Sequence, residues 1–138
     1  MHVVTFGEVM LRMAPEEFLR LAQVIPGRLE VTFGGGEVNV AVSIARQGGR
    51  AHFLTALPDN PLTDAFEAEL RKFQVGDDLI LRRPHGRFGV YYVETGANQR
   101  AGTVTYDRDH STISLTTADT YDWEAAFAGA NWFHITGI

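Results

Sequence analysis

The sequence of 138 residues contains no cysteine and only one lysine, Lys72. The absence of cysteine excludes disulfide bonds, thiolate zinc sites and cysteine nucleophiles. Acidic residues outnumber basic ones by 17 to 12, so a surface that binds nucleic acid is not expected. No apolar run is long enough to cross a membrane, and the N-terminus lacks the basic start and apolar core of a signal peptide. We therefore expect a cytoplasmic protein that binds neither nucleic acid nor membrane.

Short β-branched runs alternate along the chain with stretches of helical spacing, which predicts an α/β protein. We expect buried strands near 3–6, 51–57 and 132–135, and helices over 37–47 and 61–74. The first of these helices is apolar around most of its circumference, so we expect it to be buried. Because it follows a predicted strand at 29–33 and precedes the strand at 51–57, it completes a β-loop-α-β unit, and we expect those two strands to pair in parallel.

Three consecutive glycines, Gly34 to Gly36, separate a predicted strand at 29–33 from the helix at 37–47. Glycine allows positive φ angles and lets a ligand approach the backbone without meeting a Cβ atom. The helix would direct its free N–H groups and the positive end of its dipole into the same space. The turn thus predicts a site for an oxygen-rich or anionic small molecule, although a plain structural turn is the alternative.

The residues after the glycines do not fit the common phosphate-binding motifs. A P-loop requires Gly-Lys-Ser/Thr, which is absent here. A dinucleotide fingerprint requires a third glycine where Asn39 stands, and Glu37 would repel a pyrophosphate. The histidines show no metal-ligand spacing, so no metal site is predicted.

Two β-rich runs at 88–94 and 102–108 are joined by a polar loop, which predicts a hairpin. Alternation along the second strand places Val104, Tyr106 and Arg108 on one face. An arginine beside a tyrosine can hold an oxygen anion, because guanidinium binds a carboxylate through two hydrogen bonds. Packing within the sheet is the alternative role for the tyrosines.

Taken together, these segments resemble the N-terminal half of the ribokinase-like (phosphofructokinase-B type) carbohydrate kinases. The resemblance covers nearly the whole chain and is carried by the segments 4–8, 34–41, 46–48, 88–92 and 132–138. It implies that residues 1–138 form the N-terminal portion of one kinase domain with a three-layer α/β fold, in which helices cover a mostly parallel sheet. It also implies a small β-sheet lid, with strands near 8–14, 29–33, 88–94 and 102–108.

Within the family, Glu37 before Asn39 and the Tyr106-Asp107-Arg108 segment resemble 2-keto-3-deoxygluconate kinases. Members of that group use ATP and a divalent cation, Mg, to phosphorylate a hydroxyl of a sugar acid. The resemblance implies that six residues bind the substrate: Gly34, Gly35, Asn39, Tyr91, Tyr106 and Arg108. Arg108 would lie near the carboxylate of the sugar acid.

Several family features differ or do not occur in these 138 residues. Leu57-Pro58-Asp59 stands where many members have Gly-Asp-Asp, and Glu37 stands where generic sugar kinases have a small residue. The Gly-Ala-Gly-Asp segment, which carries the anion hole and the general base, does not occur. The nucleotide pocket and the Asn-x-x-Glu motif associated with Mg are also absent. We therefore expect no catalytic residue in this chain, no C-terminal nucleotide-binding half, and no activity of the chain alone.

Three functions remain open from the sequence. The first is the substrate-binding part of an ATP-dependent 2-keto-3-deoxygluconate kinase. The second is a truncated, non-catalytic module that binds a sugar acid or dimerises, because its lid strands expose edges that can pair with a second copy. The third is another sugar kinase, such as a ribokinase or a fructokinase.

Overall fold

The computed structural model describes residues 1–137, so Ile138, the last residue of the segment 132–138, lies outside the described residues. A parallel sheet forms the core and has the strand order β5-β4-β1-β8. Its strands are β1 (His2–Phe6), β4 (Arg50–Pro58), β5 (Ile80–Arg83) and β8 (Trp132–His134). The expected parallel pairing of the strands at 29–33 and 51–57 is wrong. The strand Arg50–Pro58 pairs in parallel with β1, in the register Val3 to Ala51, whereas the strand Glu30–Gly34 pairs antiparallel with Met10–Ala14 in another sheet.

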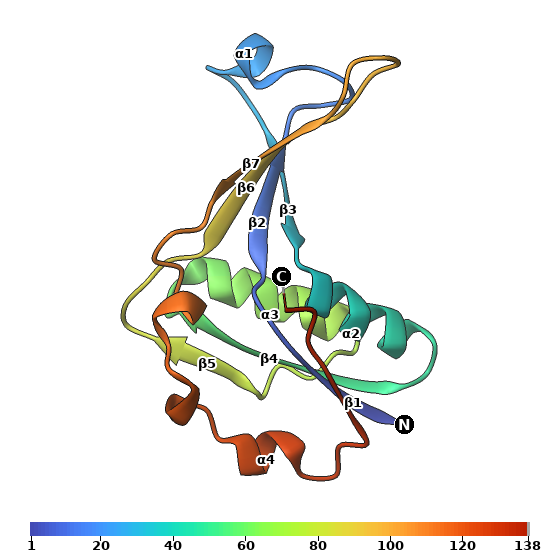
Figure 1. The fold of residues 1–138 in the computed structure, drawn as a ribbon, viewed down its shortest axis with the longest axis vertical. Coiled ribbons are helices and arrows are strands. Elements are labelled where there is room, and N and C mark those ends of the chain that lie inside the picture. The colour runs from blue at the N-terminus through green and yellow to red at the C-terminus, as the bar shows by residue number, and fades with distance from the viewer. Residues whose placement is uncertain (138) are drawn as a thin grey trace.

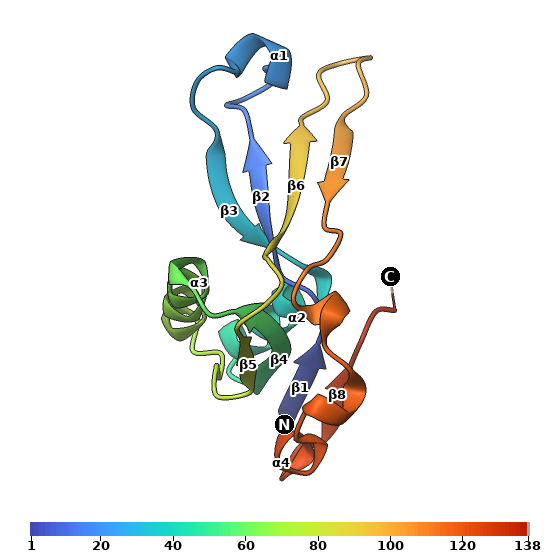
Figure 2. The same ribbon diagram turned by 90° about the vertical axis from the view of Figure 1, so that its left-hand side faces the viewer.

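A second sheet rises from one end of the core (Figure 1) and has the order β3-β2-β6-β7. Its strands are β2 (Met10–Ala14), β3 (Glu30–Gly34), β6 (Gly89–Glu94) and β7 (Thr103–Asp107). Figure 2 shows the four strands side by side, with the short helix α1 (Leu21–Val24) near their far end. The predicted hairpin is confirmed by the antiparallel pairing of β6 and β7, in which Tyr91 lies opposite Tyr106.

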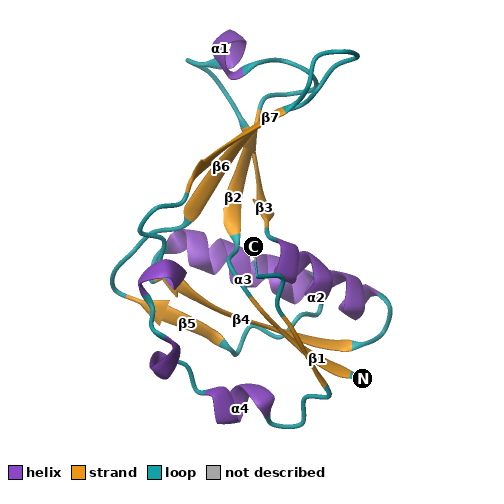
Figure 3. Cartoon of the chain, viewed as in Figure 1, coloured by secondary structure: helices purple, strands orange, loops and turns teal. Residues whose placement is uncertain are grey.

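Helices cover both faces of the parallel sheet (Figure 3). One face carries α2 (Gly36–Arg46) and α3 (Pro61–Lys72), and the other carries α4 (Trp123–Phe127) with the 3-10 turns η1 (Ile113–Leu115) and η2 (Ala118–Thr120). Alternation along β4 supplies both layers, because Phe53 packs with the first helix pair and Leu54 packs with the second set. The expected three-layer α/β fold is therefore confirmed. Among the described residues, no helix is long and apolar enough to span a membrane.

Helix α3 begins where local chemistry predicts. The side chain of Asn60 accepts hydrogen bonds from the backbone N–H groups of Leu62, at 3.0 Å, and Thr63, at 3.4 Å. Pro61 follows at the first helical position, where its missing N–H costs nothing. The asparagine and the proline together fix the first turn.

Helix α2 is less enclosed than its apolar sequence predicts. Only Glu37, Val38 and Ala41 are buried, whereas Asn39 and Ser43 are exposed. The expectation of a buried helix is wrong for the described chain, because only the side that faces the parallel sheet is covered.

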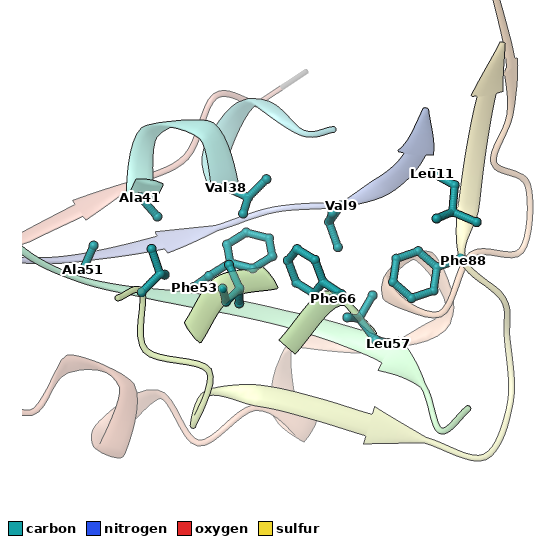
Figure 4. Packing of buried hydrophobic residues seen from close by; sticks show 11 residues of the cluster. Val9, Leu11, Val38, Ala41, Ala51, Phe53, Leu57, Phe66 and Phe88 are labelled. Carbon is teal, nitrogen blue, oxygen red and sulfur yellow. The ribbon is translucent and has the colours of Figure 1, made fainter. Parts of the chain in front are cut away.

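A cluster of aromatic rings joins the two sheets. Phe66 of α3 packs edge-on against Phe53 of β4, with ring centroids 5.8 Å apart. The same ring packs against Phe33 of β3 at 5.1 Å and against Phe88, just before β6, at 6.4 Å. Figure 4 shows Phe66 between Phe53 and Phe88. Phe66 is 1% exposed and therefore contacts both sheets away from water.

Removal of this ring should destabilise the whole chain. We expect Phe66→Ala to lower the free energy of unfolding by about 3–5 kcal/mol, because it leaves a cavity between the two sheets. Urea unfolding followed by tryptophan fluorescence measures the change. Phe18→Ala, at a residue that is 57% exposed, is the matched control and should change stability little. If the alanine variant does not fold, Phe66→Leu should show an intermediate loss, and equal stability of Phe66→Leu and wild type would contradict the role.

Candidate functional site

A cavity of about 370 Å³ lies at the carboxyl ends of β1 and β8, where the two sheets meet. The parallel layer contributes the residues that follow β1, the first turn of α2 and the segment after β8. The second sheet contributes Met10, Tyr106 and Arg108, and η1 contributes Ile113 and Ser114. The crevice outside the carboxyl ends of parallel strands is where α/β proteins commonly bind ligands.

Close packing, rather than unusual backbone angles, explains the glycine turn. A Cβ atom on Gly34 would overlap the hydroxyl of Tyr91, and one on Gly35 would lie 2.5 Å from the carbonyl oxygen of Glu8. Gly35 has a φ of 169°, which is extended backbone. Gly34 to Gly36 are not among the glycines in the left-handed region of positive φ. The expectation of positive φ angles is therefore wrong. A Cβ atom on Gly36 would make only an ordinary van der Waals contact, with Thr136 at 3.5 Å.

Glu37 ties the first turn of α2 to the segment after β8. Its Oε1 accepts hydrogen bonds from the backbone N–H of Thr136, at 3.2 Å, and from the hydroxyl of the same residue. A Cβ atom on Gly7 would overlap the carboxylate, so glycine is needed beside it. Burial raises the pKa of Glu37, but the hydrogen bonds that the carboxylate accepts outweigh burial and hold the pKa below its ordinary value of 4.5. Glu37 is therefore an ionised acid that positions the cavity wall.

One tyrosine lines the cavity, and a second tyrosine packs behind it. Tyr106 is 60% exposed and lines the cavity, and its ring lies 5.8 Å from that of Tyr91 at an angle of 33°. Burial raises the pKa of Tyr91, the neighbouring Tyr106 adds to the rise, and Arg12 opposes it. Tyr91 thus stays a neutral hydroxyl at physiological pH and supports Tyr106 from behind.

Arg108 follows β7 directly and lines the cavity. Its Nη2 donates to Oε2 of Glu8 at 2.6 Å, and the two side chains are 41% and 10% exposed. The guanidinium therefore has one buried partner and remains partly open to solvent. Among the cavity residues that the structure describes, Arg108 is the only arginine or lysine.

The structure brings together some of the six predicted site residues and separates others. Gly35, Tyr106 and Arg108 line the cavity, whereas Gly34 and Tyr91 pack directly behind it. Asn39 is exposed on another side of α2 and lines a separate cavity of about 400 Å³ between α2, α3 and β3. The substrate-binding role of all six residues stays a prediction.

Sequence reasoning did not select two acids and a threonine as cavity residues: Glu8, Glu37 and Thr136. A signal was available, because Glu8 and Thr136 lie two residues beyond the ends of β1 and β8. The carboxyl ends of parallel strands meet at one edge of the sheet, so such residues gather there. Within residues 1–137, no group of three or more His, Asp or Glu side chains could hold a metal ion.

Comparison with known proteins identifies the family. The model of the pfkB family of carbohydrate kinases matches residues 1–138. The chain belongs to the pfkB family. The predicted resemblance to ribokinase-like kinases is thereby confirmed.

Relatives of this pfkB-family chain include enzymes named for 2-keto-3-deoxy sugar acids. It is 37% identical to the 2-dehydro-3-deoxygalactonokinase of Haloferax volcanii, over 85% of this chain and 36% of that protein. It is 31% identical to the 2-dehydro-3-deoxygluconokinase of Bacillus subtilis, over 98% of this chain and 41% of that protein. The crystal structure of 2-dehydro-3-deoxygluconokinase from Thermotoga maritima superposes with a TM-score of 0.91 at 48% identity, over 97% of this chain and 40% of that chain. The chain thus spans less than half the length of these relatives.

The charge of Glu37 should make the stability of this pfkB-family chain depend on pH. Because the pKa of Glu37 is lower in the folded chain than its ordinary value of 4.5, its contribution is full above that value. The contribution is lost as the pH falls through the folded pKa. We expect Glu37→Gln to cost about 1 kcal/mol at pH 7, the difference between hydrogen bonds to a charged and to a neutral acceptor.

Urea unfolding at pH 7 and at pH 3 measures this dependence. The difference between wild type and Glu37→Gln should shrink at the lower pH, because Glu37 is protonated in the unfolded chain there and its charged form then adds less to the stability of the folded chain. Glu16→Gln, at an exposed residue, is the matched control and should have little effect at either pH. An equal loss for Glu37→Gln at both pH values would contradict the role of the charge.

Proposed function

We propose that this chain supplies the acceptor-binding part of an ATP-dependent kinase that phosphorylates a hydroxyl of a 2-keto-3-deoxy sugar acid. One observation carries the proposal. Tyr106 and Arg108 of the second sheet line the same cavity as Gly35 and Gly36 at the N-terminus of α2. The names of the relatives from Haloferax volcanii and Bacillus subtilis support this class of substrate.

The cavity offers a suitable partner for each part of a sugar acid. The guanidinium of Arg108 can bind the carboxylate through two charge-assisted hydrogen bonds. The free N–H groups of the first turn of α2 can donate to hydroxyl or keto oxygens, and no Cβ at Gly36 blocks their approach. Tyr106 can cover the carbon skeleton with its ring. Such contacts fix the orientation of the hydroxyl that reacts, which is a large part of catalysis by phosphoryl-transfer enzymes.

ATP and magnesium are the cofactors that family membership implies, and the described residues do not fit them. Glu37 places a carboxylate in the first turn of α2, where it opposes a phosphate group. No metal-binding cluster occurs within residues 1–137. We therefore assign the nucleotide, the metal and the general base to other parts of a complete kinase of this family, which acts in the cytoplasm.

A kinase for a neutral sugar fits the cavity less well. A neutral sugar, as in a ribokinase or a fructokinase, would leave Arg108 without an anionic ligand. A non-catalytic module that binds the sugar acid would use the same contacts. It differs in needing no nucleotide.

The second sheet is also the part through which we propose that two copies associate. Its strands β3 and β7 lie at the edges, every residue of β7 is exposed, and Val31 and Val104 are 53% and 50% exposed. Unpaired strand edges with apolar side chains pair readily with another chain.

Association through β7 should depend on its apolar side chains. We expect sedimentation velocity to show a dimer of the chain at tens of micromolar, on the order of a weak interface. Val104→Asp should shift the chain toward monomer, because it places charge at the interface. Asp119→Ser, at an exposed residue of η2, is the control. A wild-type chain that stays monomeric at high concentration would contradict the proposal.

The proposed reaction can be tested with a chimera. We expect residues 1–138 alone to show no ATP-dependent phosphorylation. A chimera that joins them to the remaining part of the Thermotoga maritima enzyme should phosphorylate 2-keto-3-deoxygluconate. In this chimera, Arg108→Ala should raise the KM for the acid by about 10- to 100-fold, the cost of losing charge-assisted hydrogen bonds.

Arg87→Ala is the matched control for this experiment, because Arg87 pairs with Asp107 outside the cavity. The KM for fructose, a neutral sugar, should change little in either variant. ATP-dependent turnover by residues 1–138 alone, or an unchanged KM for the acid in Arg108→Ala, would argue against the proposed function.

A further inference from the structure

An ion pair lies at the edge of the cavity, where the two sheets meet, and its carboxylate is largely shielded from solvent. Glu8 lies in the connection that leaves β1 of the parallel sheet and enters β2 of the second sheet. Its carboxylate accepts from Arg108 at 2.6 Å, and Arg108 directly follows β7 at the far edge of the second sheet. The pair therefore joins the start of the second sheet to the end of its last strand.

The space that holds the Glu8 carboxylate is shaped by Gly89, the first residue of β6. A Cβ atom at Gly89 would lie 2.6 Å from Oε1 of Glu8 and 3.3 Å from Cβ of Arg108. Oε1 is buried and has no hydrogen-bond partner within the described residues. Arg108 is thus the partner that compensates the buried charge of Glu8, which makes the pair costly to separate.

A second ion pair near β7 is more exposed to solvent than the pair of Glu8 and Arg108. Arg87 and Asp107 also approach to 2.6 Å, but their side chains are 43% and 53% exposed. Exposed pairs of this kind hold a side chain weakly, because water and salt compete with them. Glu8, at 10% exposed, is not open to that competition.

We propose that Glu8 is a positioning residue, which holds Arg108 over the cavity and so sets the preference for acidic sugars. Glu8 engages one terminal nitrogen of the guanidinium, which has five N–H donors in a fixed plane. The other donors remain available to a carboxylate in the cavity. Without Glu8, the side chain of Arg108 is free to point into solvent. This inference rests on the proposed function, because it assumes that the bound sugar carries a carboxylate.

Kinetics of the chimera test the inference through the ratio of two substrates. We expect Glu8→Gln to raise the KM for 2-keto-3-deoxygluconate by about tenfold, comparable to one lost charge-assisted contact, with little change in kcat. The KM for fructose should stay the same. Asp107→Asn removes the exposed neighbouring pair and should leave both values unchanged. An equal rise in the KM for both sugars would overturn the inference.

A double-mutant comparison separates positioning from general damage. In an Arg108→Ala background, Glu8→Gln should have no further effect on the KM for the acid, because the residue that it positions is gone. The same tenfold rise in that background would overturn the inference.

The contact itself can be measured on the 138-residue chain without any substrate. Glu8→Gln should lower the urea midpoint in the wild-type background and should lower it much less in the Arg108→Ala background. If the chimera fails to phosphorylate any sugar acid, the proposed function is contradicted. The comparison of urea midpoints in the two backgrounds still decides whether Glu8 holds Arg108. Equal midpoint shifts in the two backgrounds would show that it does not.

Discussion

The packing of four phenylalanine rings holds the two sheets of this chain in one relative orientation, and the cavity depends on that packing. Phe66 of α3 contacts Phe53 in the parallel sheet and also Phe33 and Phe88 at the base of the second sheet. Edge-to-face contacts between aromatic rings add directional attraction to the burial of apolar surface. The cavity takes Arg108 from the end of the second sheet and α2 from the helices that cover the parallel sheet. A change in the relative orientation of the two sheets would therefore separate the residues that we expect to bind one ligand.

Glycines leave room for charged side chains where the two sheets meet. Gly7 makes space for the carboxylate of Glu37, and Gly89 makes space for the carboxylate of Glu8. Protein interiors are close-packed, so a single added methyl group at either position would displace a buried charge. In this chain, glycines near the cavity act through the volume that they leave empty.

The charges around the cavity favour one class of ligand over another. An ionised acid in the first turn of α2 is stabilised by the helix dipole and disfavours phosphate at the same place. Arg108, which lines the same cavity, can bind a single anion. We propose that the cavity suits a molecule with hydroxyl groups and one carboxylate, a class of substrate that the names of relatives support, although the chain matches less than half of their length.

Features set by neighbouring residues could be predicted from the sequence. Asn60 and Pro61 determine the start of α3 through contacts within its own first turn. The alternation of β7 places Tyr106 on the cavity side, and Arg108, just beyond the strand, follows the same direction. These outcomes depend on backbone periodicity and on contacts a few residues apart, which a linear sequence displays directly.

Other features were decided only by the tertiary structure. Gly35 and Gly36 of the glycine turn line the cavity, but Gly34 and Gly35 are required by Tyr91 and by the backbone of Glu8. The partners of the two cavity acids are far away in sequence, and Glu37 and Thr136 are 99 residues apart. Asn39 lies one turn into α2 and faces a different cavity, because the rotation of a helix about its axis is fixed by what packs against it. The sequence by itself determined the elements and the family, whereas long-range packing decided which side chains share the cavity.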